Sequence, residues 1–121
     1  MLGHDPVALA TIQLAKAIGL DTILVRDKGP DRAPEGLADM YLNLSAAKAF
    51  EAVALDAWSA VVTTTHDLEQ DHEALQIALK APCFYVGALG SKRRVEDRHT
   101  KLRAAGLSAT QIGKQIGRAH V

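Results

Sequence analysis

The sequence is poor in cysteine, in aromatic side chains and in long apolar runs. Cys83 is the only cysteine among 121 residues, so no disulfide can form within the chain, and we expect a reducing, cytoplasmic compartment. The formal net charge is zero at pH 7, which argues against bulk electrostatic binding to nucleic acid or to a membrane surface. No apolar run is long enough to span a bilayer, and the first residues lack the basic-then-apolar layout of a signal peptide.

What the chain does contain is 48% hydrophobic residues, enough for the packed core of one domain. Segments with helical periodicity alternate with short apolar runs that end in charged or polar residues. We expect helices over 7–18, 45–55, 67–81, 91–106 and from 108 onward, and strands over 22–27, 39–44, 59–65 and 83–89. Strands separated by helices indicate βαβ units. The predicted fold class is therefore α/β, a Rossmann-like parallel sheet flanked by helices.

Both ends of the sequence differ from those of an intact doubly wound domain. The chain starts with "MLGHDPVALA", a loop that enters a helix, where such a domain would place a strand. We therefore expect the first strand to be missing. At the other end, "IGRAHV" (Ile116–Val121) matches a common sequencing-adapter sequence when it is read back into codons. We assign residues 1–115 to a partial Rossmann domain and 116–121 to a non-native tail.

Ligands of this fold bind at the carboxyl ends of the strands, where three segments carry candidate residues. In the first, "GHDPVA", Gly3 and its neighbour His4 would let backbone N–H groups approach a phosphate. The segment is not G-x-G-x-x-G, and Asp5 would either repel a pyrophosphate or simply cap the helix. After the next strand, Asp27 stands where a ribose-binding acid would lie, and the neighbouring Arg26 could instead bind a 2′-phosphate. A solvated strand end explains both residues equally well.

The second segment is "VVTTTHDLEQDHEAL", in which three threonines end a strand and ionisable residues open a helix. Asp67 is a good N-cap, and acids favour the positive end of a helix dipole. Capping does not explain Thr65 and His66, so we take these two and Asp67 as ligand-binding candidates. His72 and Glu73 are weaker ones. The six-residue spacing of His66 and His72 differs from that of H-E-x-x-H, so we predict no metal site.

The third segment is "YVGALGSKRR". Gly87 and Gly90 bracket the end of the last expected strand, and Ser91, Lys92 and Arg93 open a helix. Cations are unfavourable at a helix N-terminus unless an anion sits there, so glycines, a cap serine and basic residues together predict an anion pocket. The alternative is a flexible turn followed by a solvated basic face.

Three stretches, "GHDPVALA", "VVTTTHDLEQDHEAL" and "YVGALGSKRRVEDRHTKLRAAGLS", occur in this order and together resemble the C-terminal Rossmann domain of the XdhC family. These are the xanthine dehydrogenase accessory proteins (XdhC/CoxI-like). The resemblance extends to about Lys114. It implies binding of molybdenum cofactor and help with its sulfuration and insertion into xanthine dehydrogenase or related hydroxylases, the role of an accessory protein rather than a catalyst. Members carry a further N-terminal domain, so the chain looks like a fragment.

On this hypothesis the three segments form one cofactor-binding pocket, with no catalytic residue assigned. Its residues are Gly3, His4, Thr65, His66, Asp67, Gly87, Gly90, Ser91, Lys92 and Arg93. Lys92 and Arg93 would neutralise the phosphate or dinucleotide tail, and His66 and Asp67 would face the pterin or the metal.

Two other functions stay open. The chain could be an NAD(P)-binding oxidoreductase domain or a non-catalytic domain that docks partners. The partners expected under the XdhC hypothesis are a xanthine dehydrogenase-type molybdoenzyme and a cysteine desulfurase. An unpaired sheet edge would favour a homodimer as well.

Overall fold

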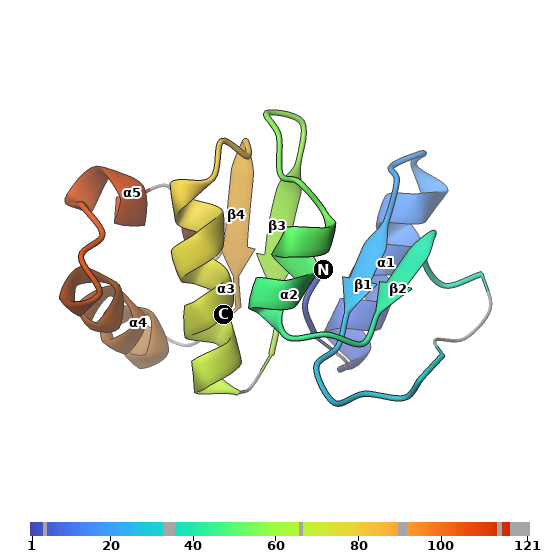
Figure 1. The fold of residues 1–121 in the computed structure, drawn as a ribbon, viewed down its shortest axis with the longest axis horizontal. Coiled ribbons are helices and arrows are strands. Elements are labelled where there is room, and N and C mark those ends of the chain that lie inside the picture. Colours follow the sequence, from blue (N-terminus) through green and yellow to red (C-terminus); the bar gives the residue numbers. More distant parts are fainter. Residues whose placement is uncertain (4, 33–35, 66, 90–91, 114, 117–121) are drawn as a thin grey trace.

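The computed structural model describes residues 1–3, 5–32, 36–65, 67–89, 92–113 and 115–116. Helices and strands alternate as the sequence predicts, except that β2 follows β1 and α5 follows α4 without an intervening element of the other kind (Figure 1). The helices are α1 (Pro6–Ala17), α2 (Ala46–Ala52), α3 (Leu68–Lys80), α4 (Lys92–Ala104) and α5 (Ala109–Gly113). The strands are β1 (Ile23–Val25), β2 (Met40–Leu42), β3 (Ala60–Thr63), β4 (Tyr85–Ala88) and β5 (Gln115–Ile116). The strands are shorter than expected, α2 ends three residues early, and β5 was not predicted.

The sheet is parallel and is joined in the middle by the first residues of the chain. β1 pairs with β2, and β4 pairs with β3 and β5, all in parallel. Leu2 forms parallel bridges to both Val25 and Thr63, and Val25 N donates to Met1 O at 2.8 Å. Residues 1–3 therefore fill the central position where we expected a missing strand, and the order is β2, β1, residues 1–3, β3, β4, β5. The predicted Rossmann-like α/β fold is confirmed.

Side-chain caps explain where several helices begin. Asp5 accepts a hydrogen bond from Ala8 N at 2.8 Å, with a proline in the first turn of α1. Asp67 Oδ1 accepts from the backbone N–H groups two and three residues further on, at 3.0 and 3.1 Å. Ser108 and Gln111 cap α5 reciprocally, side chain to backbone in each direction. All three caps satisfy N–H groups that have no partner within a helix.

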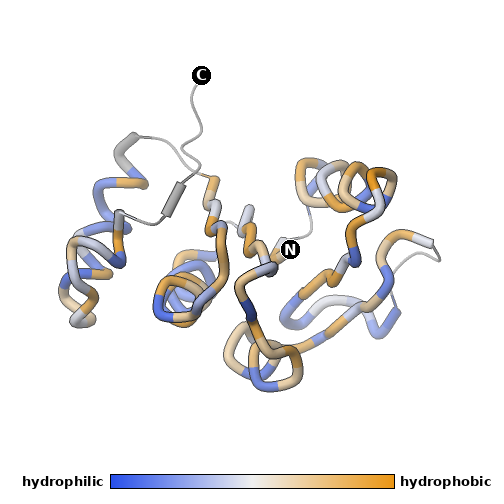
Figure 2. The backbone as a smooth tube through the Cα atoms, turned by 90° about the horizontal axis from the view of Figure 1, so that it is seen from above, coloured by the Kyte–Doolittle hydropathy of each residue, from blue (hydrophilic) through white to orange (hydrophobic). Residues whose placement is uncertain are grey.

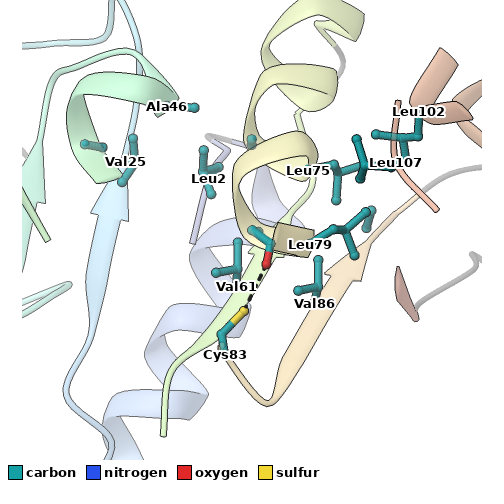
Figure 3. Close-up of a cluster of buried hydrophobic side chains, with 14 of the residues drawn as sticks. Leu2, Val25, Ala46, Val61, Leu75, Leu79, Cys83, Val86, Leu102 and Leu107 are labelled. Atoms are coloured by element: carbon teal, nitrogen blue, oxygen red, sulfur yellow. Dashed lines mark hydrogen bonds between the residues drawn. The ribbon is translucent and has the colours of Figure 1, made fainter. Parts of the chain in front are cut away.

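The helices cover the two faces of the sheet unequally. Seen from above, α1 lies on one side of the strands, and α2 and α3 lie on the other (Figure 2). The larger core cluster packs between α3 and the sheet and includes Leu2, Val61, Leu75, Leu79 and Val86 (Figure 3). A smaller cluster joins α1 to β1 through Ile12, Leu24 and Leu37.

Cys83 lies in the larger core. It is 1% exposed, and its Sγ donates to Ala78 O at 3.3 Å (Figure 3). Trp58, by contrast, flanks β3 and is exposed. Within the described residues, no helix is both long enough and apolar enough to cross a membrane.

Candidate functional site

A cavity of about 250 Å³ opens where the carboxyl ends of the central strands meet. Its walls come from the turn into α1, the end of β1, and the starts of α2 and α3. The lining residues are Leu2, Gly3, Val25, Arg26, Asp27, Lys28, Gly29, Leu44, Ala46, Thr65, Asp67 and Gln70. We call it the strand-end cavity. Its position matches the crevice in which open α/β sheets bind their ligands.

Gly3 allows three segments to meet at one corner of this cavity. Its φ of 152° lies outside the usual range of L side chains, and a Cβ added there would overlap Thr64 Oγ1 and lie 3.2 Å from Ala8 Cβ. Thr64 Oγ1 in turn donates to Asp5 Oδ1 at 3.0 Å. Any larger residue at Gly3 would separate the central strand from β3 and α1. The expected capping role of Asp5 is confirmed, and its carboxylate also ties α1 to the end of β3.

The turn from β3 into α3 forms a second wall. Thr65 is buried, and its Oγ1 accepts from Asp67 N at 3.2 Å. Its carbonyl oxygen accepts from Arg94 Nη2, on α4, at 2.7 Å. This turn is therefore fixed from both sides, with the exposed carboxylate of Asp67 at the start of the helix.

The end of β1 supplies the charges of the third wall. Arg26 is half-buried, and its buried Nε has no hydrogen-bond partner in the described part of the chain. Lys28 adopts a left-handed backbone conformation, with φ of 59°, which costs a non-glycine residue about 1 kcal/mol or more. Asp27 lies between them. Strained backbone and an unpartnered buried donor are features that favour a ligand site at this wall.

Comparison with known proteins identifies the domain. A family model described as the XdhC Rossmann domain matches residues 1–118. The chain belongs to the XdhC family. It is 32% identical over 118 residues to the molybdenum cofactor insertion chaperone PaoD of Escherichia coli strain K12, a match that covers 95% of this chain and 31% of PaoD. This XdhC domain thus spans about a third of that relative's length.

A crystal structure of a xanthine dehydrogenase from Bacillus halodurans is similar to the XdhC domain in fold. The TM-score is 0.71 at 24% sequence identity, and the match covers 82% of this chain and 30% of the other. At this identity the likeness shows the common fold, in agreement with the α/β class that the sequence predicts.

The XdhC domain brings together three of the ten predicted site residues. Gly3, Thr65 and Asp67 line the strand-end cavity. Four others, His4, His66, Gly90 and Ser91, lie outside the described residues. Lys92 and Arg93 fall in the first turn of α4, with side chains outside the described part of the structure.

Gly87, the remaining predicted residue, is the last residue but one of β4. It pairs with Val62, and a Cβ at this position would come within 2.8 Å of the Tyr85 ring. Close packing of that ring over the strand explains the glycine, and Gly87 does not line the strand-end cavity.

A buried ion pair that was not predicted from the sequence joins α3 to α4. Arg98 Nε donates to Asp71 Oδ2 at 2.9 Å, and the two side chains are 3% and 5% exposed. Thr63 Oγ1 donates to the other carboxylate oxygen at 3.3 Å, and Arg98 Nη2 donates to Leu89 O at 3.0 Å. The pair therefore links the carboxyl ends of β3 and β4 through α3 and α4. One signal for this pair was present in the sequence. Asp71 follows the cap residue Asp67 by four positions, about one helical turn, so it is not needed as a cap and can face the protein interior.

Glu73 also has a structural role. Its Oε1 accepts from Ala47 N at 2.9 Å. Ala47 lies at the start of α2, where the helix dipole stabilises a carboxylate. Among the described residues, no three His, Cys, Asp or Glu side chains are placed to hold a metal ion.

Proposed function

We propose that this XdhC domain binds molybdenum cofactor in the strand-end cavity and takes part in the maturation and insertion of that cofactor into xanthine dehydrogenase-type molybdenum hydroxylases. On this proposal it is an accessory protein, and its partner is the recipient molybdoenzyme. The observation that carries the proposal is a polar, charged cavity at the strand ends of a domain whose relative is a molybdenum cofactor insertion chaperone.

The walls of the cavity supply groups that suit different parts of the cofactor. Arg26 and Lys28 would pair with a phosphate. The N–H groups at the start of α3 are already taken by Asp67, so phosphate binding would depend on these side chains. The carboxylate of Asp67 and the hydroxyl of Thr65 would accept from or donate to the polar edge of a pterin.

The size of the cavity suits a cofactor that is only partly enclosed by the protein. At about 250 Å³ it is smaller than the roughly 300–1,000 Å³ typical of pockets that enclose a whole ligand. A cofactor held by one part can still be passed to a recipient, which is what an insertion factor requires. The predicted contacts of His66, Lys92 and Arg93 would complete the pocket and belong to the same proposal.

The alternative of NAD(P) binding is weakened by Asp5. In a dinucleotide site the pyrophosphate accepts hydrogen bonds from the N-terminus of the first helix. Here the Asp5 carboxylate accepts from Ala8 N at 2.8 Å and from Thr64 Oγ1 at 3.0 Å. A negative group thus already occupies the helix start, and a pyrophosphate would be repelled there.

Direct binding measurements would test the proposal. Calorimetric or fluorescence titrations of the chain would compare purified molybdenum cofactor with NADPH and NAD. We expect cofactor binding that Arg26→Ala and Thr65→Val each weaken about tenfold, the loss typical of one charge-assisted or buried hydrogen bond. Arg103→Ala is the matched control, because Arg103 is exposed on α4 and lines neither the strand-end cavity nor the groove described below.

Two results would contradict the proposal. Preferential binding of NADPH or NAD would revive the oxidoreductase hypothesis. A folded chain that binds none of the three ligands would favour the partner-docking hypothesis instead.

A further inference from the structure

A second cavity lies between α3 and α4 and has a volume of about 520 Å³. We call it the helix groove. It shares no lining residue with the strand-end cavity, and the function proposed above makes no use of it. Its α4 wall carries Arg94, Arg98 and Lys101, which are spaced so that they lie on one side of a helix.

Arg98 has an unused donor inside the protein. The residue is 4% exposed, its Nε bonds to Asp71 and its Nη2 to Leu89 O, but its buried Nη1 has no partner in the described part of the chain. A buried charged donor without an acceptor is costly, and Arg98 lines the helix groove, so an acceptor bound there would satisfy this donor.

His72 adds a second unsatisfied atom on the opposite wall. It lines the groove from α3, and its Nδ1 is buried without a partner among the described residues. Two carboxylates also face the groove, Asp71 and Asp97. Arg98 engages the first, and the second is exposed, so three cationic side chains and two carboxylates line the groove.

We propose that the helix groove is a binding site for an oxyanion, the carboxylate or phosphate group of a small ligand. The anion accepts a hydrogen bond from Arg98 Nη1 and contacts His72 Nδ1, and Lys101 contributes positive charge. A metal cation does not fit, because three cationic side chains line the groove. A neutral ligand leaves the guanidinium donor without a charged acceptor.

Titration of the 121-residue chain, followed by ¹H–¹⁵N NMR, tests this site. Inorganic phosphate and acetate are added separately, with ionic strength held constant by chloride, so that the two anion classes are compared directly. We expect saturable shifts in α3 and α4 around Leu68, His72 and Arg98 with at least one of the anions. The anion with the higher affinity identifies the class of the natural ligand.

Variants then assign the binding to the groove. His72→Ala and Lys101→Ala should each weaken the affinity for the bound anion about fivefold or more. Arg98→Lys keeps a positive charge beside Asp71 but removes Nη1, and should weaken it further. Lys80→Ala is the control, because Lys80 is exposed at the far end of α3. This variant should bind the anion with the affinity of the parent chain.

The outcomes are distinct from those of the cofactor titrations. Absence of saturable shifts with both anions would overturn the proposal, as would shifts confined to the strand-end cavity. Unchanged affinity in both His72→Ala and Lys101→Ala would also overturn it, and this pair carries the test if Arg98→Lys does not fold.

Discussion

Helices α1 and α3 are almost equal in length, 12 and 13 residues, but they are packed very differently. α3 buries Asp71, Ala74, Leu75, Ala78 and Leu79. α1 buries Ala8 and Ile12 and leaves Leu14 and Ile18 68% and 77% exposed. The more apolar helix is thus the less buried one. What decides burial is the position on the sheet, since α3 packs against β3 and β4 and has a helix on each side.

The ion pairs of the two regions show the same contrast. Arg98 and Asp71 form a buried pair at 2.9 Å. Lys16 of α1 and Asp39 form a pair at 3.7 Å, with side chains 38% and 47% exposed. Removing one member of a buried pair leaves a charge without compensation, whereas water replaces the partner of an exposed one. The buried pair therefore joins α3 firmly to α4, and the exposed pair on the α1 side contributes little to stability.

The largest expected effect comes from breaking the buried pair. Asp71→Ala should lower the free energy of unfolding by about 3–5 kcal/mol, because Arg98 is left buried and uncompensated. Lys16→Ala, the matched change in the exposed pair, should leave it nearly unchanged. Urea denaturation of both variants measures the difference. Equal losses in Asp71→Ala and Lys16→Ala would contradict the prediction, because they would mean that burial of the Arg98–Asp71 pair adds nothing to the cost of breaking it.

Truncation of one leucine on each helix tests the packing itself. Leu75 is 0% exposed, so Leu75→Ala should lower the free energy of unfolding by about 2–5 kcal/mol through lost burial and a cavity. Leu14→Ala should change it by about 0.5 kcal/mol or less, as for other surface substitutions. The same urea titrations provide the values. A large loss for Leu14→Ala would mean that α1 is covered in solution.

The helix caps should have smaller and unequal effects. Asp67→Ala removes an N-cap and should lower the free energy of unfolding by about 1 kcal/mol. Asp5→Ala should lower it more, because Thr64 Oγ1 also loses its acceptor. Asp5→Asn is the control, since asparagine caps helices as well as aspartate does. Thermal and urea unfolding would rank the three variants. An unchanged free energy of unfolding in Asp5→Ala would refute the role of Asp5 in tying α1 to the end of β3.

The smallest expected effect depends on pH and concerns the α1 side. Thr22 N and Thr22 Oγ1 donate to Asp39 Oδ2 at 2.8 and 3.1 Å, and the backbone hydrogen bond from Thr22 is the main reason that the pKa of Asp39 lies below its ordinary value of 3.8. A lowered folded-state pKa stabilises the protein at pH values above 3.8, and this contribution is lost as the pH falls through the folded-state value. The acid limb of a stability–pH curve should therefore flatten in Asp39→Asn. An unchanged curve would contradict the assignment.

Local patterns predicted those parts of the structure that depend on neighbouring residues. The caps Asp5 and Asp67 were predicted from sequence because each acts on N–H groups two or three positions away. The alternation of helices with apolar runs predicted the parallel sheet, because strands that are separated by helices form βαβ units. The sequence also placed Gly3, Thr65 and Asp67 at one edge of the sheet, where the structure finds them in one cavity.

Features that join distant elements were not predictable in this way. Asp71 and Arg98 lie 27 positions apart, and in sequence the aspartate is simply one more acid in the first turns of a helix. The packing of the Tyr85 ring against Gly87 was also not predictable, because the strand pattern does not show which ring lies over the glycine. β5 has two residues, which are too few to show the apolar pattern from which a strand is predicted.

The place of Leu2 in the sheet has a consequence for the order in which the domain assembles during translation. Its two neighbours are Val25 and Thr63, and the second leaves the ribosome about 60 residues after Leu2, which at about 5–20 residues per second corresponds to roughly 3–12 seconds. Until then the segment has only β1 beside it, and the β3 side of its backbone stays open. The centre of the sheet, although it comes first in the sequence, is closed only when the middle of the chain has been synthesised.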